Sequence, residues 1–298
     1  MRTPVVSPYT AFNALPDSRP EDADVLLLPL PYERTVSSGR GTGLAPAAIW
    51  AASQQGEFYD DEMGRSLDEW TYYSAQPPVD AEPGVYHTRV TRAARALHEY
   101  DGLVVGVGGE HSVTPPLIEA AMDGAKDYRA LTVVHFDAHA DLRPQWGGSR
   151  YSHASALYPV VERGAALVTI GIGDISREEL RYAQEARVAL FRAQELATND
   201  ALLLARLARI TGPVYVTVDV DCLDLSLCPG TGTPVPGGLS WNQAISYLKA
   251  LLYGNRATEL IGLDLVETVP QSTTQINETV AVGLLDKAIL YALAAPLR

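Results

Sequence analysis

Apolar runs without polar alternation recur along this sequence, and stretches with the helical spacing of apolar residues separate them. A strand that is apolar at nearly every position is buried on both faces, as in a parallel sheet that helices cover on each side. The runs rich in Val, Leu and Ile that we expect to form such strands are Asp24–Pro29, Leu103–Gly108, Leu131–Phe136, Ala166–Gly171, Val188–Phe191, Val214–Val220 and Leu260–Val266.

Helical patterns lie between these runs. They cover Arg89–Tyr100, Pro115–Met122, Glu178–Ala186, Asp200–Ile210, Trp241–Tyr253 and Thr279–Ala294. Strands that alternate with helices are typical of an open α/β fold, in which ligands bind at the carboxyl ends of the strands. With 298 residues the chain could form one large domain or two small ones, and no linker-like segment favours two.

The overall composition argues against a nucleic-acid partner and is compatible with a cationic ligand. With 298 residues, of which 47% are apolar and 20% charged, the chain has the balance of a globular protein. The formal net charge of -13 and the lack of any Lys/Arg block argue against a nucleic-acid partner. An acidic chain suits a cationic ligand, although acidic surfaces also serve solubility.

The sequence shows neither a disulfide framework nor a targeting segment. Only Cys222 and Cys228 are present, which is too few to cross-link a chain of this length. The segment Met1–Ala11 lacks the apolar core of a secretory signal, and no apolar run is long enough to span a bilayer. We therefore expect a cytoplasmic protein without a membrane partner.

The strongest chemical signal follows the run Leu131–Phe136. Asp137, His139 and Asp141 come directly after it at every second position. In an extended segment, residues i, i+2 and i+4 point to one side, so these three side chains share one pocket. Buried groups of this kind would repel one another or lose solvation without a counter-ion. The pattern therefore favours a metal site.

A second strand ends in the same way. The run Val214–Val220 contains Asp219 and is followed by Asp221, so two carboxylates lie on one side. Like charges this close need a cation or a shared proton. Taken alone, the pattern fits a turn built by Asp221 and Asp224 equally well. Together with the first motif, it favours further metal ligands.

A third strand, Leu103–Gly108, runs into a glycine turn with His111 at its end. The spacing of this turn matches neither the dinucleotide-binding pattern nor the P-loop, and no lysine follows. A lone histidine in a turn is usually structural, but this one lies at the same end of the expected sheet as the two acidic motifs. His111 is therefore the sixth candidate ligand.

Four carboxylates and two imidazoles make a ligand set rich in oxygen. Such a set is harder than the thiolate or three-histidine sets typical of zinc, and it is too large for one ion. Two Mn²⁺ ions about 3.5–4 Å apart could share a water molecule, lower its pKa and hold the resulting hydroxide beside an electrophilic carbon. The sequence therefore predicts a hydrolase with two Mn²⁺ per chain.

These motifs resemble the ureohydrolase family, the arginase and agmatinase group, and in particular an agmatinase-like member. The matching segments, in family order over nearly the whole chain, are Gly108–Ser112, His135–Asp141, Asp219–Gly238 and Leu263–Glu267, with an agmatinase-like N-terminal pattern in Thr35–Thr42. The resemblance implies one ureohydrolase domain over residues 1–298. It also implies a three-layer α/β/α fold around a central, mostly parallel eight-stranded sheet, and a homo-oligomer, either a trimer or a hexamer.

The resemblance also assigns roles to the matching residues. One Mn²⁺ would be held by His111, Asp137, Asp141 and Asp219, and the other by Asp137, His139, Asp219 and Asp221. Asp141 would further accept the proton of the attacking hydroxide and pass it to the leaving amine. Glu267 would pair with the guanidinium group of the substrate, since a carboxylate can accept two parallel N–H bonds from this group.

Other residues are expected near the pocket. By the same resemblance Thr233 would line it, and His153 at its mouth would shuttle protons or steady the substrate amine; an ordinary loop histidine is the alternative. We expect His135 to point away from the neighbours of Asp137, unless it packs beside the site, and assign it no chemistry. Glu110, directly before the candidate ligand His111, stands where the family more usually has aspartate. This difference could tune metal affinity.

The expected substrate is a small cationic guanidino compound. Leu142-Arg143-Pro144 replaces the polar residues with which arginases hold the amino-acid end of arginine, so arginine is disfavoured and the loop Arg143–Ser155 should select the tail. Agmatine, cut to putrescine and urea, is the leading substrate; aminopropylagmatine, guanidinobutyrate and formiminoglutamate are the alternatives. A non-catalytic ligand-binding protein on the same fold and a one-metal zinc deacetylase of related architecture are the other classes that stay open.

Overall fold

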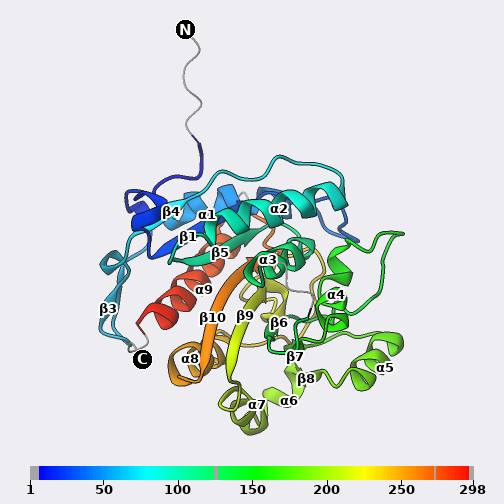
Figure 1. The fold of residues 1–298 in the computed structure, drawn as a ribbon. Coiled ribbons are helices and arrows are strands. Elements are labelled where there is room, and N and C mark those ends of the chain that lie inside the picture. Colours follow the sequence, from blue (N-terminus) through cyan, green and yellow to red (C-terminus); the bar gives the residue numbers. More distant parts are fainter. Residues whose placement is uncertain (1–6, 124–126, 272, 295–298) are drawn as a thin grey trace.

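A computed structural model describes residues 7–123, 127–271 and 273–294 of the chain (Figure 1). Within these residues, eight strands form one sheet in the order β4-β1-β5-β10-β9-β6-β7-β8, and its neighbouring strands run parallel. The strands are β1 (Val25–Leu30), β4 (Tyr72–Ser74), β5 (Leu103–Gly108), β6 (Thr132–Phe136), β7 (Ala166–Ile172), β8 (Ala189–Arg192), β9 (Gly212–Asp219) and β10 (Thr258–Val266). A short antiparallel hairpin is formed separately by β2 (Tyr59–Asp60) and β3 (Arg65–Ser66).

Helices cover both faces of this sheet. One layer contains α1 (Ala45–Ser53), α6 (Ala193–Leu196), α7 (Ala201–Leu207), α8 (Trp241–Lys249) and α9 (Ile276–Leu293), and the other contains α2 (Pro83–Leu97), α3 (Thr114–Ala121), α4 (Tyr158–Glu162) and α5 (Arg177–Glu185). A single π-helical turn, Ala250–Gly254, continues α8. The expected three-layer α/β/α architecture with an eight-stranded parallel sheet is therefore confirmed (Figure 1).

Strand β1 illustrates why the strands lack polar alternation. Val25 and Leu27 pack into the core under one helical layer, whereas Leu26, Leu28 and Leu30 pack into the core under the other. All five side chains are fully buried. Because both faces of the sheet are covered, every position of such a strand is apolar, as the sequence predicts.

The sequence analysis did not predict the short elements α4, α6, β2 and β3, and it also missed strand β4 and helix α1, whose sequences explain why. Strand β4 has only three residues, which is too short to show a periodic pattern. Helix α1 reads Ala-Pro-Ala-Ala-Ile-Trp-Ala-Ala-Ser and has almost no polar side chain that would mark a helical face. The bounds of β5, in contrast, are those expected from the sequence.

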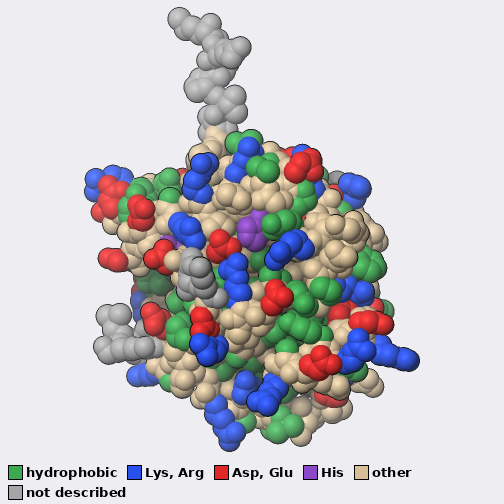
Figure 2. Space-filling model, turned by 45° about the vertical axis from the view of Figure 1, so that its right-hand side comes forward, with side chains coloured by type: hydrophobic (Ala, Val, Ile, Leu, Met, Phe, Trp, Pro, Cys, Tyr) green, Lys and Arg blue, Asp and Glu red, His purple; other side chains and the backbone are tan. Residues whose placement is uncertain are grey.

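The surface carries charges of both signs. On the face drawn in Figure 2, Lys/Arg and Asp/Glu side chains are interspersed, and the described residues form no continuous basic patch there. Among the helices of the described residues, none combines the length and the apolar character that crossing a bilayer requires.

Candidate metal centre

The candidate site lies at the carboxyl ends of four neighbouring central strands, β5, β10, β9 and β6. His111 follows β5, Asp137 follows β6, Asp219 ends β9 and Glu267 follows β10. Because the strands are parallel, these ends meet at one edge of the sheet. Residues that are far apart in the sequence are thus brought together where α/β sheets usually bind ligands.

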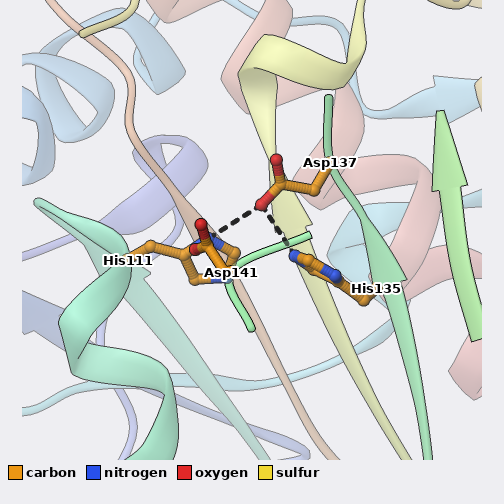
Figure 3. Close-up of side chains that lie close together, drawn as sticks. All are labelled: His111, His135, Asp137 and Asp141. Atoms are coloured by element: carbon orange, nitrogen blue, oxygen red, sulfur yellow. Dashed lines mark hydrogen bonds and ion pairs between the residues drawn. The ribbon is translucent and has the colours of Figure 1, made fainter. Parts of the chain in front are cut away.

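The imidazole of His111 is surrounded by carboxylates. Its Nδ1 atom lies 3.1 Å from Oδ2 of Asp137, 3.2 Å from Oδ2 of Asp141 and 3.3 Å from Oδ2 of Asp219. All four side chains are buried, and Figure 3 shows His111, Asp137 and Asp141 gathered around one point. Within the described residues, Nδ1 has no hydrogen-bond partner. A buried ring nitrogen that lacks a hydrogen-bond partner and is surrounded by carboxylate oxygens is typical of a cation site.

The second ring nitrogen of His111, Nε2, contacts the hydroxyl of Thr217. Nε2 lies 3.0 Å from Oγ1 of Thr217, and this hydroxyl donates a 2.6 Å hydrogen bond to Oδ1 of Asp264. The Tyr215 hydroxyl donates to the other oxygen of Asp264 at 2.8 Å. The Thr217 hydroxyl donates its only proton to Asp264. In the contact between His111 and Thr217, the proton is therefore on Nε2 of His111 and is donated to the hydroxyl oxygen. In the neutral ring, Nδ1 then presents its lone pair to the carboxylates, which is the form that binds a cation.

A second group of candidate ligands shares Asp137 with the first. Nδ1 of His139 lies 2.9 Å from Oδ2 of Asp221 and 3.5 Å from Oδ1 of Asp137. The backbone N–H of Ala138 donates to Oδ1 of Asp221 at 3.0 Å, and the Thr233 hydroxyl donates to its Oδ2 at 3.4 Å. In each group, His111–His135–Asp137–Asp141 and Asp137–His139–Asp221, the ligand atoms lie within 4.8 Å of one another.

Burial and mutual repulsion control the charge of these carboxylates. Burial, together with repulsion from Asp221 and Asp137, raises the pKa of Asp219 well above its usual range. Burial and repulsion from Asp137 also raise the pKa of Asp221 to about 6, against the opposing effect of His139. Carboxyl groups whose ionised form is destabilised in this way gain strongly from a nearby cation.

The donor set fits two hard divalent cations. The two groups share Asp137, so this carboxylate would serve as a ligand to both ions. Asp219 belongs to the same cluster, because its Oδ1 accepts the backbone N–H of Asp221 at 2.8 Å and its Oδ2 faces His111. Carboxylate oxygens and imidazole nitrogens without a thiolate suit Mn²⁺ better than ions that prefer sulfur. The six residues predicted as ligands are thus gathered in one place.

Glu267 and His153 stand beside the cluster. Nδ1 of His153 lies 3.6 Å from Oε1 of Glu267, and the same oxygen accepts the backbone N–H of His111 at 2.8 Å. Glu267 and Asp141 have left-handed backbones, with φ of 64° and 51°. This conformation costs about 1–2 kcal/mol in a residue other than glycine. Such strain clusters at functional sites, where the surroundings hold the residue in place.

A cavity of about 220 Å³ opens onto the cluster. His139, Asp141 and Asp219 reach it from the cluster, and Thr233 and His153 line it as the sequence predicts. The loop expected to select the substrate tail contributes further lining residues, which are Arg143, Trp146 and Ala154.

Sequence reasoning missed Asp174, which lines the same cavity. This residue comes two positions after the end of β7 and is exposed. Within the described residues, no hydrogen bond or ion pair reaches its carboxylate, whereas its backbone N–H donates to the carbonyl of Ala138 at 3.0 Å. The signal that could have identified it is the one that identified the ligands, an acidic residue directly after a buried strand.

Of the two placements expected for His135, the one that points it away from the neighbours of Asp137 is wrong, and the one that packs it beside the site is confirmed. Two positions separate the residues, so both side chains lie on the same side of the strand. Nε2 of His135 lies 2.7 Å from Oδ2 of Asp137 (Figure 3). Its Nδ1 lies 3.2 Å from Oγ1 of Thr169. With both ring nitrogens engaged, His135 orients Asp137.

Comparisons with known proteins agree with this geometry. A model of the Arginase family matches residues 23–291. The N(1)-aminopropylagmatine ureohydrolase of Thermus thermophilus is 39% identical over 268 residues, which cover 89% of this chain and 89% of that protein. The agmatinase of Bacillus cereus is 31% identical over 256 residues, 84% of this chain and 85% of that protein. The solved structure of proclavaminate amidino hydrolase from Streptomyces clavuligerus has the same fold, with a TM-score of 0.86 at 24% identity over 96% of this chain and 97% of that one.

Proposed function

The chain belongs to the arginase family of guanidino hydrolases, and from this premise we propose that it cuts a guanidine with a cationic polyamine tail, above all N1-aminopropylagmatine. The products would be urea and the free polyamine. The observation that carries the proposal is the pair of candidate cation sites that share Asp137 next to a cavity, with Glu267 beside them.

Each part of the reaction has a residue suited to it. Two Mn²⁺ ions on the six ligands would supply the Lewis acidity that makes a water molecule nucleophilic near neutral pH. Glu267 orients the planar guanidinium through a charge-assisted hydrogen bond. Asp141, which faces both the cluster and the cavity, accepts the proton of the attacking water. The same proton passes to the alkyl nitrogen as the C–N bond breaks, so urea and the amine leave together.

The charges at the cavity mouth favour a cationic tail. Arg143 is already paired, since its Nη2 lies 3.3 Å from Oε2 of Glu179 and its guanidinium carbon lies 4.5 Å from the ring centre of Trp146. The carboxylate of Asp174 has no such partner within the described residues. An ammonium group on the substrate tail would supply it, and the Trp146 ring offers an apolar wall for the methylene groups.

The relatives favour the longer tail. The Thermus thermophilus relative named for N1-aminopropylagmatine is 39% identical, against 31% for the Bacillus cereus agmatinase. Agmatine, the leading substrate in the sequence analysis, is therefore the second candidate. It presents the same guanidinium and one ammonium group, so it can use Glu267 and Asp174 in the same way.

The test is a substrate panel with the Mn²⁺-loaded protein. We expect the highest kcat/KM for N1-aminopropylagmatine, a lower value for agmatine and little turnover of guanidinobutyrate, formiminoglutamate or arginine, measured as urea or formamide released. Activity on arginine alone would overturn the substrate class. Metal analysis tests the other classes: no bindable Mn²⁺ would favour a ligand-binding protein, and one ion per chain would favour the zinc-deacetylase alternative.

A further inference from the structure

Glu110, which follows β5 directly before the candidate ligand His111, is fully buried and points its carboxylate at another segment of the chain. Its Oε2 accepts the backbone N–H groups of Arg34 and Thr35, both at 2.7 Å. Its Oε1 accepts the hydroxyls of Thr35 at 2.5 Å and Ser112 at 2.6 Å. Four donors therefore occupy this carboxylate, three of them from Arg34 and Thr35.

Thr35 connects Glu110 to His153 through a hydrogen bond. Its hydroxyl oxygen, whose proton goes to Glu110, accepts the backbone N–H of His153 at 3.0 Å. A buried carboxylate beside the metal centre is thus connected, through one hydroxyl, to the histidine at the cavity mouth.

Ser37, two residues further along, determines which nitrogen of His153 carries the proton. The Ser37 backbone N–H donates to Nε2 of His153 at 3.2 Å, and its hydroxyl lies 3.1 Å from the same atom. A backbone N–H can only donate, so Nε2 accepts and the proton of the neutral ring sits on Nδ1. Nδ1 is the atom that faces Glu267, at 3.6 Å.

The segment that holds His153 depends on its anchors. Ser37 and Gly39 are exposed, so packing does little to fix them. The Gly39 backbone N–H donates to the carbonyl of Gly232 at 3.0 Å, which ties the far end of the segment to the loop that carries Thr233. The other end is tied by Glu110 through Arg34 and Thr35.

We propose that Glu110 is a positioning residue: through Thr35 it fixes the segment 34–37 so that Ser37 holds His153 with its Nδ1 proton directed at Glu267. This inference rests on the proposed function, in which Glu267 binds the guanidinium. It also gives a reason for glutamate in place of aspartate. A side chain shorter by one C–C bond, about 1.5 Å, reaches the Arg34 and Thr35 amides and the two hydroxyls less well.

The kinetic test is a double-mutant cycle between Thr35 and His153. Thr35→Val removes the connecting hydroxyl and should lower kcat/KM about tenfold, whereas Thr35→Ser keeps the hydroxyl and should restore most of it. In a His153→Ala background, Thr35→Val should cost less than about twofold, because the effect passes through His153. Thr88→Val, on the exposed face of α2, is the matched control and should keep the activity of the unmodified protein.

Mn²⁺ content and a second readout separate this proposal from the proposed function. Thr35→Val and Glu110→Asp should bind the same amount of Mn²⁺ as the unmodified protein. Equal losses of kcat/KM in both backgrounds, or loss of Mn²⁺, would overturn the proposal. The nitrogen NMR signals of the His153 ring, recorded without paramagnetic Mn²⁺, should show the Nδ1–H tautomer in the unmodified protein and a mixture in Thr35→Val and Glu110→Asp. Unchanged signals in both variants would overturn the positioning role, even if no guanidino compound is hydrolysed.

Discussion

The backbone N–H of His111 donates a 2.8 Å hydrogen bond to Oε1 of Glu267. The loop that presents a candidate metal ligand therefore also fixes the candidate partner of the guanidinium. Oε1 is engaged in this way, whereas within the described residues no hydrogen bond reaches Oε2, the oxygen that would face the guanidinium in the proposed function. Gly232 lies next to this oxygen, and a Cβ atom there would come to 3.4 Å from it.

This geometry makes Glu267→Gln a selective test of guanidinium binding. The His111 N–H requires an acceptor, so the amide oxygen of the glutamine should take the place of Oε1 and the NH₂ group that of Oε2. A donor would then face the donors of the substrate. A lost hydrogen bond to a charged group is worth about 1.5–3 kcal/mol, so we expect kcat/KM to fall about 10- to 150-fold. The control is metal content, which should not change; a variant that loses Mn²⁺ would contradict this assignment.

Removal of the shared carboxylate should affect both ions. Asp137 belongs to both candidate ligand groups, whereas His139 belongs to one. Asp137→Asn should therefore leave less than about one Mn²⁺ per chain, and His139→Asn should retain about one. Elemental analysis after dialysis against a fixed Mn²⁺ concentration measures both. Equal metal content in the two variants would show that Asp137 does not bridge.

The sequence reveals the candidate ligands more readily than the groups that support them. The six candidate ligands end buried strands or stand in the turns that follow them, where an acidic residue or histidine interrupts an apolar pattern. Asp264, in contrast, lies inside β10 and reaches His111 only through Thr217 of β9. That contact depends on β9 and β10 being neighbours with Asp264 opposite Thr217. Periodicity along one chain does not reveal the order or the register of strands.

His135 should affect metal affinity without being a ligand. Both of its ring nitrogens have partners, Asp137 and Thr169, so it orients a ligand carboxylate. Removal of such a partner typically weakens metal binding about 10- to 100-fold. His135→Phe should therefore raise the Mn²⁺ concentration needed for half-maximal activity by this factor, while kcat at saturating Mn²⁺ recovers. A variant that cannot be saturated to two ions per chain would identify His135 as a ligand.

Mn²⁺ binding should strengthen as pH rises through about 6. Burial raises the pKa of Asp221 to about 6, and for His139 the ion pairs with Asp137 and Asp221 outweigh burial and raise the pKa to about 12. In the metal-free protein, both groups hold protons more tightly than in the unfolded chain. Their contribution to the free energy of unfolding is complete below their unfolded pKa values and is lost as pH rises through the folded ones.

Metal ligands must release these protons, so the gain in Tm on adding Mn²⁺ should be larger at about pH 7.5 than at about pH 5. Calorimetry with and without Mn²⁺ at the two values measures it. The asparagine in Asp221→Asn cannot titrate, so in this variant the Mn²⁺-induced gain in Tm should no longer change with pH near 6. An equal or larger gain at the lower pH would contradict the proposed ligation.

Asp174 should distinguish substrates by the charge of their tails. Its carboxylate lines the cavity and has no partner within the described residues, so Asp174→Asn removes an attraction for an ammonium and a repulsion for a carboxylate. An exposed ion pair is worth about 0.2–1 kcal/mol, which predicts up to a fivefold rise in KM for N1-aminopropylagmatine and agmatine, with kcat unchanged. For guanidinobutyrate, whose tail is anionic, KM should fall. Asp61→Asn, in the turn between β2 and β3, changes the net charge equally and is the matched control. Because KM shifts in opposite directions for the two kinds of tail, a general loss of stability cannot produce this result. A KM that moves in the same direction for both kinds of tail would show that Asp174 does not contact the substrate.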